Sequence, residues 1–143
     1  MSSDEVELSY GGVVVRGDPP EVVTIVPRRR RTVALPKGGA NPSETPEESA
    51  LREVREETGI VATIREELGA VDYTYRRGGR NIRKTVRFFL CDYVSGSTDD
   101  HDHEVDEARW MPIDEALRRL SFPGERRMVR MAASRLARAR TDR

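Results

Sequence analysis

The feature that most constrains this chain is a loop followed by a helix with both ends marked, within residues 38–60. Thr45 is followed by Pro46 and then by Glu48, the pattern of a capping box in which the Thr and Glu side chains each bond the other's backbone N–H. Gly59 stands where a left-handed residue ends a helix. These signals predict one helix between them, entered from a glycine-containing loop.

Three glutamates share one face of this helix. Glu53, Glu56 and Glu57 are spaced i, i+3 and i+4, which brings side chains together on an α-helix. An apolar stripe runs beside them, formed by Ala50, Leu51 and Val54. One face of the helix can therefore pack on a sheet while the acidic face borders a cleft. Arg52 lies four residues before Glu56, so we expect it to pair with that carboxylate and fix its orientation.

The acidic face has two interpretations. Carboxylates about 6 Å apart repel each other by roughly 3 kcal/mol at an effective dielectric of about 20, but by less than about 1 kcal/mol in water. The cluster therefore costs little free energy on an open surface, whereas in a cleft it needs a cation among its oxygens. Ligation by carboxylates alone favours Mg²⁺ or Mn²⁺ over zinc. On the spacing of these glutamates alone, a solvated acidic face stays open as the alternative.

The wider spacing argues for the cleft. Residues 38–60 match the pattern Gly-x5-Glu-x7-Arg-Glu-(apolar)-x-Glu-Glu-x-Gly-(apolar) at Gly38, Glu44, Arg52, Glu53, Val54, Glu56, Glu57, Gly59 and Ile60. This resembles the Nudix box of the MutT-like hydrolases, and the Leu-Pro-Lys at residues 35–37 resembles the family's lead-in. Two departures are minor: Ser43 replaces a Gly that many members have before the Glu, and residues 32–34 lack an aromatic side chain.

The resemblance implies an α+β fold, the Nudix-type α/β/α sandwich with a central mixed β-sheet. The order of expected elements agrees, because strands on both sides of one central helix, with helices at the end, predict a mixed sheet covered on both faces. We expect strands at residues 9–16, 22–26, 33–35, 61–64, 68–76, 82–94 and 105–111, and further helices at 113–120 and 125–138.

Length and composition predict one domain over residues 1–143, with residues 1–7 and 139–143 expected to be flexible. No apolar run approaches the ~20 residues that span a membrane. The N-terminus lacks a secretory pattern and Cys91 is the single cysteine, so we expect a cytoplasmic protein in which Cys91 is a core residue. Whether it is a monomer or a homodimer stays open.

Charge is balanced but segregated. Lys and Arg together number 25, as do Asp and Glu. Residues 28–37 and 76–87 are basic without an acid, while residues 99–107 are acidic without Lys or Arg. An anionic substrate bridged by cations would use both kinds of segment. Nucleic-acid binding is not expected, because the chain has no reading motif and no net charge.

Site residues follow from the helix, the segregated charges and the resemblance. The metal ligands are expected to be Glu53, Glu56 and Glu57, one of which could instead be the general base. The resemblance adds a backbone carbonyl of Gly38 and the carboxylate of Glu104, with Glu107 in reserve, and leaves Glu44 to support the loop or ligate an outer metal. The expected catalytic set is thus Arg52, Glu53, Glu56, Glu57 and Glu104.

Substrate contacts are expected on the neighbouring strands. Lys37, Lys84 and Arg87 are assigned to phosphates, since each is fixed on or beside a strand. Tyr73 and Tyr75 lie two apart and so share one side of a strand, where either could stack on a base or simply pack. A transition-metal site at His101 and His103 is a weaker alternative, because no cysteine is near.

The resemblance implies hydrolysis of a nucleoside diphosphate linked to another group, with Mg²⁺ or Mn²⁺. Residues 73–90 resemble the branch that cleaves diadenosine polyphosphates, and the long basic segments favour a substrate with several phosphates. We therefore expect a dinucleoside polyphosphate such as diadenosine tetraphosphate. Residues 104–112 resemble enzymes that sanitise oxidised nucleotides, so (8-oxo-)dGTP is the alternative, followed by ADP-ribose. A nucleotide-sensing domain without catalysis is the non-enzyme alternative.

Overall fold

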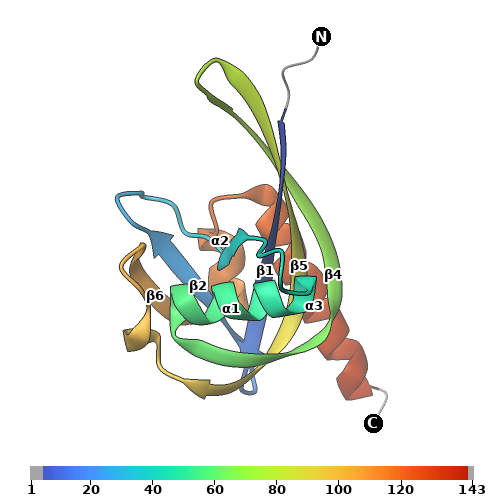
Figure 1. Cartoon of the computed structure of the whole chain (residues 1–143). Coiled ribbons are helices and arrows are strands. Elements are labelled where there is room, and N and C mark those ends of the chain that lie inside the picture. Colours follow the sequence, from blue (N-terminus) through green and yellow to red (C-terminus); the bar gives the residue numbers. More distant parts are fainter. Residues whose placement is uncertain (1–4, 142–143) are drawn as a thin grey trace.

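A computed structural model describes residues 5–141 of the chain (Figure 1). Within them the elements are β1 Glu5–Arg16, β2 Glu21–Pro27, β3 Lys37–Gly39, α1 Pro46–Thr58, β4 Ile60–Arg77, β5 Arg80–Gly96, the 3-10 turn η1 Thr98–Asp100, β6 Val105–Pro112, α2 Ile113–Arg119 and α3 Pro123–Thr141. None of the helices in the described part has the length and apolar character that crossing a membrane requires.

The strands form one mixed sheet. Their order is β4-β5-β1-β2-β6, and β3 pairs with β1 beside this path. β1 runs parallel to β5, whereas the remaining pairs are antiparallel. The predicted mixed sheet is therefore confirmed.

Helices cover both faces of the sheet, with α1 on one side and α2 and α3 on the other (Figure 1). Successive side chains of a strand point to opposite faces, so the apolar run of β1 serves two cores. Val13 packs in the cluster that contains Met128 of α3. Val14 packs in the cluster that contains Val54 of α1. This arrangement confirms the α/β/α sandwich.

Helix α1 begins and ends where the sequence predicted. The Thr45 hydroxyl accepts the backbone N–H of Glu48 at 3.1 Å, and the Glu48 carboxylate accepts the backbone N–H of Thr45 at 2.8 Å. Gly59 adopts φ 77°, a left-handed conformation that costs glycine little, and its N–H caps the carbonyl of Arg55. The capped helix fixes the direction in which the acidic face points.

Other boundaries differ from the expectations. The strand expected at residues 33–35 is reduced to one bridge between Ala34 and Ile25, and strand pairing resumes only at Lys37. The two strands expected at residues 61–64 and 68–76 are one strand, β4, interrupted by register shifts. Those shifts bend β4 around the domain, which a local pattern does not show.

The ends are more structured than expected. Residues 5–7 belong to β1 and pair with β5, and residues 139–141 belong to α3. The rest of the termini expected to be flexible, residues 1–4 and 142–143, lies outside the described residues. The start of β1 and the hairpin of β4 and β5 form a ribbon that extends beyond the helices (Figure 1).

Candidate active site

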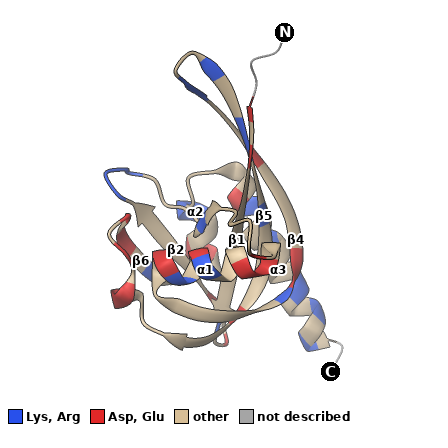
Figure 2. Cartoon of the chain, viewed as in Figure 1, with Lys and Arg blue, Asp and Glu red and all other residues tan. Residues whose placement is uncertain are grey.

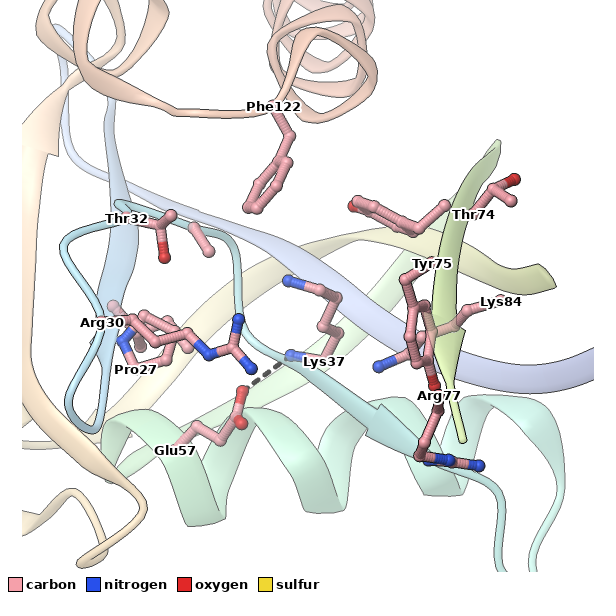
Figure 3. Close-up of a pocket in the computed structure, with 13 residues that line it drawn as sticks. Pro27, Arg30, Thr32, Lys37, Glu57, Thr74, Tyr75, Arg77, Lys84 and Phe122 are labelled. Carbon is pink, nitrogen blue, oxygen red and sulfur yellow. Dashed lines mark hydrogen bonds between the residues drawn. The ribbon is translucent and has the colours of Figure 1, made fainter. Parts of the chain in front are cut away.

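A cavity of about 650 Å³ lies between the sheet, the C-terminal end of α1 and the loop that joins α2 to α3 (Figure 3). It is lined by Ile25, Pro27, Arg30, Thr32, Ala34, Lys37, Glu57, Tyr73, Thr74, Tyr75, Arg77, Lys84 and Phe122. Four of these side chains are cationic and one is acidic. Figure 2 shows basic residues on the loop after β2 and on the β4–β5 hairpin, and acidic residues along α1 and before β6. The cavity joins these two kinds of surface.

Glu57 brings the acidic helix face to the cavity. Its carboxylate accepts a hydrogen bond from the backbone N–H of Lys37 at 2.8 Å, drawn as a dashed line in Figure 3. Burial raises the pKa of Glu57 to about 8, and the neighbouring carboxylates of Glu53 and Asp102 push it in the same direction. Glu57 is thus a half-buried carboxylate in a crowded acidic neighbourhood, where a cation would favour its ionised form.

Glu53 lies against the loop that precedes the helix. A Cβ atom added at Gly38 would lie 2.0 Å from Oε2 of Glu53, so only glycine lets the loop approach this closely. The pKa of Glu53 is raised by burial, against the effect of its 2.6 Å ion pair with Arg52. The carboxylates of Glu56 and Glu104 raise it further. Gly38 and Glu53, assigned separately from the sequence, are therefore direct neighbours.

Arg52 connects the loop to the acidic face. Its Nε donates to both oxygens of Glu44 at 2.9 and 3.0 Å, and its Nη2 donates to the carbonyl of Gly39 at 3.0 Å. The carboxylate of the predicted partner Glu56 is exposed and lies farther from Arg52, at 3.4 Å. Glu44 also accepts from the Ser49 hydroxyl at 2.9 Å. The principal role of Arg52 in this structure is to hold the loop, with Glu56 as a minor contact.

The acidic loop before β6 packs against the same helix. The backbone N–H of Asp102 donates to the carbonyl of Glu56 at 2.9 Å, and Asp102 also accepts the N–H of Glu104 through its side chain at 3.1 Å. Asp102 acts on the pKa of Glu57, and Glu104 on that of Glu53. Glu104, which the sequence analysis chose, stays a prediction, and Asp102 was not among the predicted site residues although it lies close enough to act on Glu57. Glu107 lies within β6, where its carboxylate is 3.6 Å from Arg109.

The donor set suits a hard divalent cation, because it consists of carboxylate and carbonyl oxygens. Within residues 5–141, however, no three Asp, Glu, His or Cys side chains converge into a ready-made metal site. The present partners account for this, since Glu53 is turned to Arg52 and Glu57 to the N–H of Lys37. Holding a cation would require these side chains to turn, while α1 keeps their backbones on one face.

Lys37 and Tyr73 share a buried partner that the sequence prediction missed. The Lys37 ammonium lies 3.0 Å from Oε2 of Glu125, and the Tyr73 hydroxyl donates to the same oxygen at 2.5 Å. The ring of Tyr73 packs edge-on against Phe122, with centroids 5.6 Å apart. Burial, and then the charge of Glu125, raise the pKa of Tyr73. Tyr73 is therefore fixed by packing and a hydrogen bond at the wall of the cavity.

The two phosphate candidates on β5 are separated by the sheet. Lys84 lines the cavity, and its pKa is lowered by burial and then by the charge of Lys37. Arg87 is not part of the lining; it forms a two-pronged ion pair with Glu67 at 2.7 and 2.8 Å. Tyr75 does line the cavity, and its hydroxyl donates to Glu7 on β1, across the intervening strand β5. The structure thus brings Lys84 and Tyr75 to the site but leaves Arg87 elsewhere.

Further lining residues were not among the predicted site residues. Arg30 and Arg77 belong to the two basic segments, so segregated charge was a signal for both. Phe122 offered no local signal of its position. Cys91 is buried, and burial raises the pKa of its thiol to about 12, which agrees with the predicted core role. Nδ1 of His101 lies 2.8 Å from the backbone carbonyl of Asp102.

Comparison with known protein families matches residues 9–132 to the family model described as NUDIX domain. A protein of Mycobacterium tuberculosis (strain CDC 1551 / Oshkosh) with the provisional name mutator protein MutT4 is 38% identical over 144 residues, which cover 95% of this chain and 58% of that protein. An 8-oxo-(d)GTP phosphatase of Mycolicibacterium smegmatis is 33% identical over 121 residues, covering 85% of this chain and 36% of that protein. The chain therefore spans only part of both relatives.

Solved structures share the fold. A NUDIX hydrolase from Nitrosomonas europaea superimposes with a TM-score of 0.73 at 20% identity, covering 91% of this chain and 90% of that one. A C. elegans Ap4A hydrolase, solved as a binary complex, gives a TM-score of 0.71 at 20% identity, covering 92% and 98% of the two chains.

Proposed function

Because the chain belongs to the Nudix family and folds as a MutT-like Nudix hydrolase domain, we propose that it hydrolyses a phosphoanhydride bond in nucleoside diphosphate derivatives. Its substrate in this proposal is a dinucleoside polyphosphate such as diadenosine tetraphosphate. Nudix hydrolases generally use divalent metals, and Mg²⁺ or Mn²⁺ is the proposed cofactor. A bound cation of this kind neutralises the phosphates and lowers the pKa of a water molecule.

One observation carries the substrate proposal: four cationic side chains line the same cavity as Glu57 (Figure 3). Lys37 lies on β3 and Lys84 on β5, while Arg30 and Arg77 come from the loop after β2 and from the hairpin. Only Glu57 opposes them among the lining residues. A cavity with this excess of positive charge favours a long phosphate chain over a diphosphate.

The chain's own residues have distinct tasks in this proposal. Glu53 and Glu57 would hold the cation, with Glu56 and Glu104 as further carboxylates from the same acidic surface. Arg52 keeps the loop in place through Glu44 and the carbonyl of Gly39, whichever way Glu53 turns. Gly38 lets that loop approach Glu53, and its carbonyl is the proposed backbone ligand.

The nucleoside has an apolar place in the same cavity. Four apolar lining residues lie outside the hairpin of β4 and β5: Ile25, Pro27, Ala34 and Phe122. Phe122 projects toward the cavity from the loop between α2 and α3 (Figure 3). Tyr75, on the hairpin wall, is the proposed stacking residue for the second base of a dinucleotide, because Tyr73 is held by Glu125.

An oxidised guanine nucleotide is the second candidate. It is favoured by one observation, the 33% identity to a protein named 8-oxo-(d)GTP phosphatase. ADP-ribose is a third candidate, which the excess of cationic lining disfavours.

The test is turnover by the purified protein with Mg²⁺ or Mn²⁺ across diadenosine tetraphosphate, 8-oxo-dGTP, dGTP and ADP-ribose, with products separated by chromatography. We expect the highest kcat/KM for diadenosine tetraphosphate, with a nucleoside monophosphate and a nucleoside triphosphate as products. A higher kcat/KM for 8-oxo-dGTP would transfer the proposal to the second candidate. Tight nucleotide binding without turnover of any of them would support a sensing domain instead.

A further inference from the structure

Glu125 is the only acidic side chain among the fully buried residues of the described part of the chain. It lies in the first turn of α3, far in sequence from α1. Its Oε1 accepts the backbone N–H of Leu35 at 2.7 Å. Its Oε2 accepts the Tyr73 hydroxyl at 2.5 Å and lies 3.0 Å from the Lys37 ammonium. A buried ion pair adds little net stability. The function of this pair therefore lies in the residues whose positions it fixes.

Lys37 is the residue that it holds. An ammonium has three N–H donors; one faces Glu125 and another donates to the carbonyl of Leu35 at 3.3 Å. The third is left for the cavity that Lys37 lines. The ammonium also lies 5.6 Å from the ring centroid of Tyr73 and 5.7 Å from that of Phe122. Its position is therefore fixed on several sides.

The same residue reaches the acidic helix through its backbone. The N–H of Lys37 donates to Oε1 of Glu57 at 2.8 Å. Leu35, two residues earlier, is held by Glu125 through its own N–H. One carboxylate of α3 thus fixes both ends of the short segment 35–37, whose middle residue is Pro36 and whose last residue touches Glu57.

We propose that Glu125 is a positioning residue of the active site. It holds the Lys37 ammonium with one N–H directed at the substrate phosphates, and it places the Lys37 backbone against Glu57. This inference rests on the proposed function, because it assigns Glu125 an effect on turnover that is exerted through Lys37. Glu125 itself touches neither the substrate nor the cation.

A double-mutant cycle tests the dependence on Lys37. Glu125→Gln keeps the size of the side chain and an acceptor for Leu35 but removes the charge, and it should lower kcat/KM about tenfold. In a Lys37→Met background the same change should lower kcat/KM by less than about twofold, since the partner is already gone. Equal losses in both backgrounds would overturn the inference, because a merely structural role gives additive effects.

Amine labelling provides a readout that needs no activity. Lys37 and Lys84 are the only lysines in the sequence, so trace acetylation followed by peptide mass spectrometry reports on two known ε-amines. Relative to a small lysine compound in the same tube, Lys37 should react about tenfold faster in Glu125→Gln than in the wild type, as expected for the loss of one charge-assisted bond. An unchanged Lys37 rate would overturn the inference.

Two further variants complete the design. Glu115→Gln is the matched control, because Glu115 accepts from Arg109 and Arg119 at 2.8 Å on α2, outside the cavity lining. It should leave both kcat/KM and the Lys37 labelling rate unchanged. If Glu125→Gln does not fold, Glu125→Asp is labelled instead; it withdraws the carboxylate from Lys37 while staying charged, and labelling should again rise.

Failure of the proposed function is distinguishable from failure of the inference. If the wild type hydrolyses no nucleotide, the proposed function falls, and labelling still decides whether Glu125 holds Lys37. If the wild type is active and the two losses are additive, the inference falls while the proposed function stands.

Discussion

Gly38 lies so close to the carboxylate of Glu53 that a Cβ atom at this position would be 2.0 Å from Oε2. The colliding atoms are the far end of a flexible side chain, not backbone. The fold can therefore accommodate a larger residue at position 38, but only if the carboxylate of Glu53 moves.

The first prediction separates activity from stability at this contact. Gly38→Ala should lower kcat by about 10²-fold, because Glu53 is displaced from the acidic face, and shift Tm by only a few degrees. Gly39→Ala is the comparison, since a Cβ there meets nothing within 4 Å. Its loss of kcat should be at least about tenfold smaller. Comparable losses in the two variants would show that crowding of Glu53 is not the cause.

The second prediction concerns the carboxylates of α1. Glu56→Gln or Glu57→Gln should lower turnover by at least about 10²-fold without unfolding the protein. Glu47→Gln, an exposed residue in the first turn of the same helix, should leave turnover unchanged. Circular dichroism and steady-state kinetics check both. An active Glu57→Gln protein would contradict the proposed metal site.

The third prediction follows from the raised pKa of Glu57, about 8 in the folded protein against 4.5 for an ordinary glutamate. Between these values the folded state holds a proton that the unfolded chain has released, so the contribution of Glu57 to the free energy of unfolding falls as pH rises. A divalent cation competes with that proton.

Stabilisation by Mg²⁺ should therefore increase between about pH 6 and about pH 9. The measurement is the rise in Tm on adding Mg²⁺ at each pH, for the wild type and for Glu57→Gln. The variant should show a smaller rise and a flatter dependence on pH. A rise in Tm that is equal at both ends of the range in the wild type would exclude Glu57 as a ligand that must lose its proton.

The fourth prediction contrasts the two cations of β5. Lys84→Met should raise KM for diadenosine tetraphosphate about tenfold and for ADP-ribose much less, because Lys84 lines the cavity where a long phosphate chain would lie. Arg87→Met should change neither, since Arg87 is paired with Glu67 outside the lining. Equal losses for both substrates in Lys84→Met would refute the phosphate assignment.

Interactions between residues close in sequence made α1 predictable. The caps at Thr45 and Gly59 act over one turn of chain, so their effect can be read without knowing the fold. The acidic face followed from helical spacing. The position of Glu125 did not, because its burial depends on α3 packing against Leu35 and Tyr73, which are distant in sequence.

The structure separates Lys84, which lines the cavity, from Arg87, which does not. Residues three apart on a strand face opposite sides of the sheet, so the spacing already argued against a common site. The strand expected at residues 33–35 failed for another reason: the N–H groups of Val33 and Leu35 donate to the side chains of Ser121 and Glu125, and only Ala34 pairs with a strand. Burial and strand pairing give the same short pattern in a sequence.

The ribbon of β1, β4 and β5 has a mechanical consequence. Arg77 ends β4 at the hairpin turn and Tyr75 lies two residues before it. The ribbon extends past the helices in Figure 1, so this wall of the cavity is attached to the rest of the domain at one end only. Its flexing would widen or narrow the entrance without disturbing either core. A domain built in this way can accommodate ligands of different size in the cavity while the wall formed by α1 keeps its position.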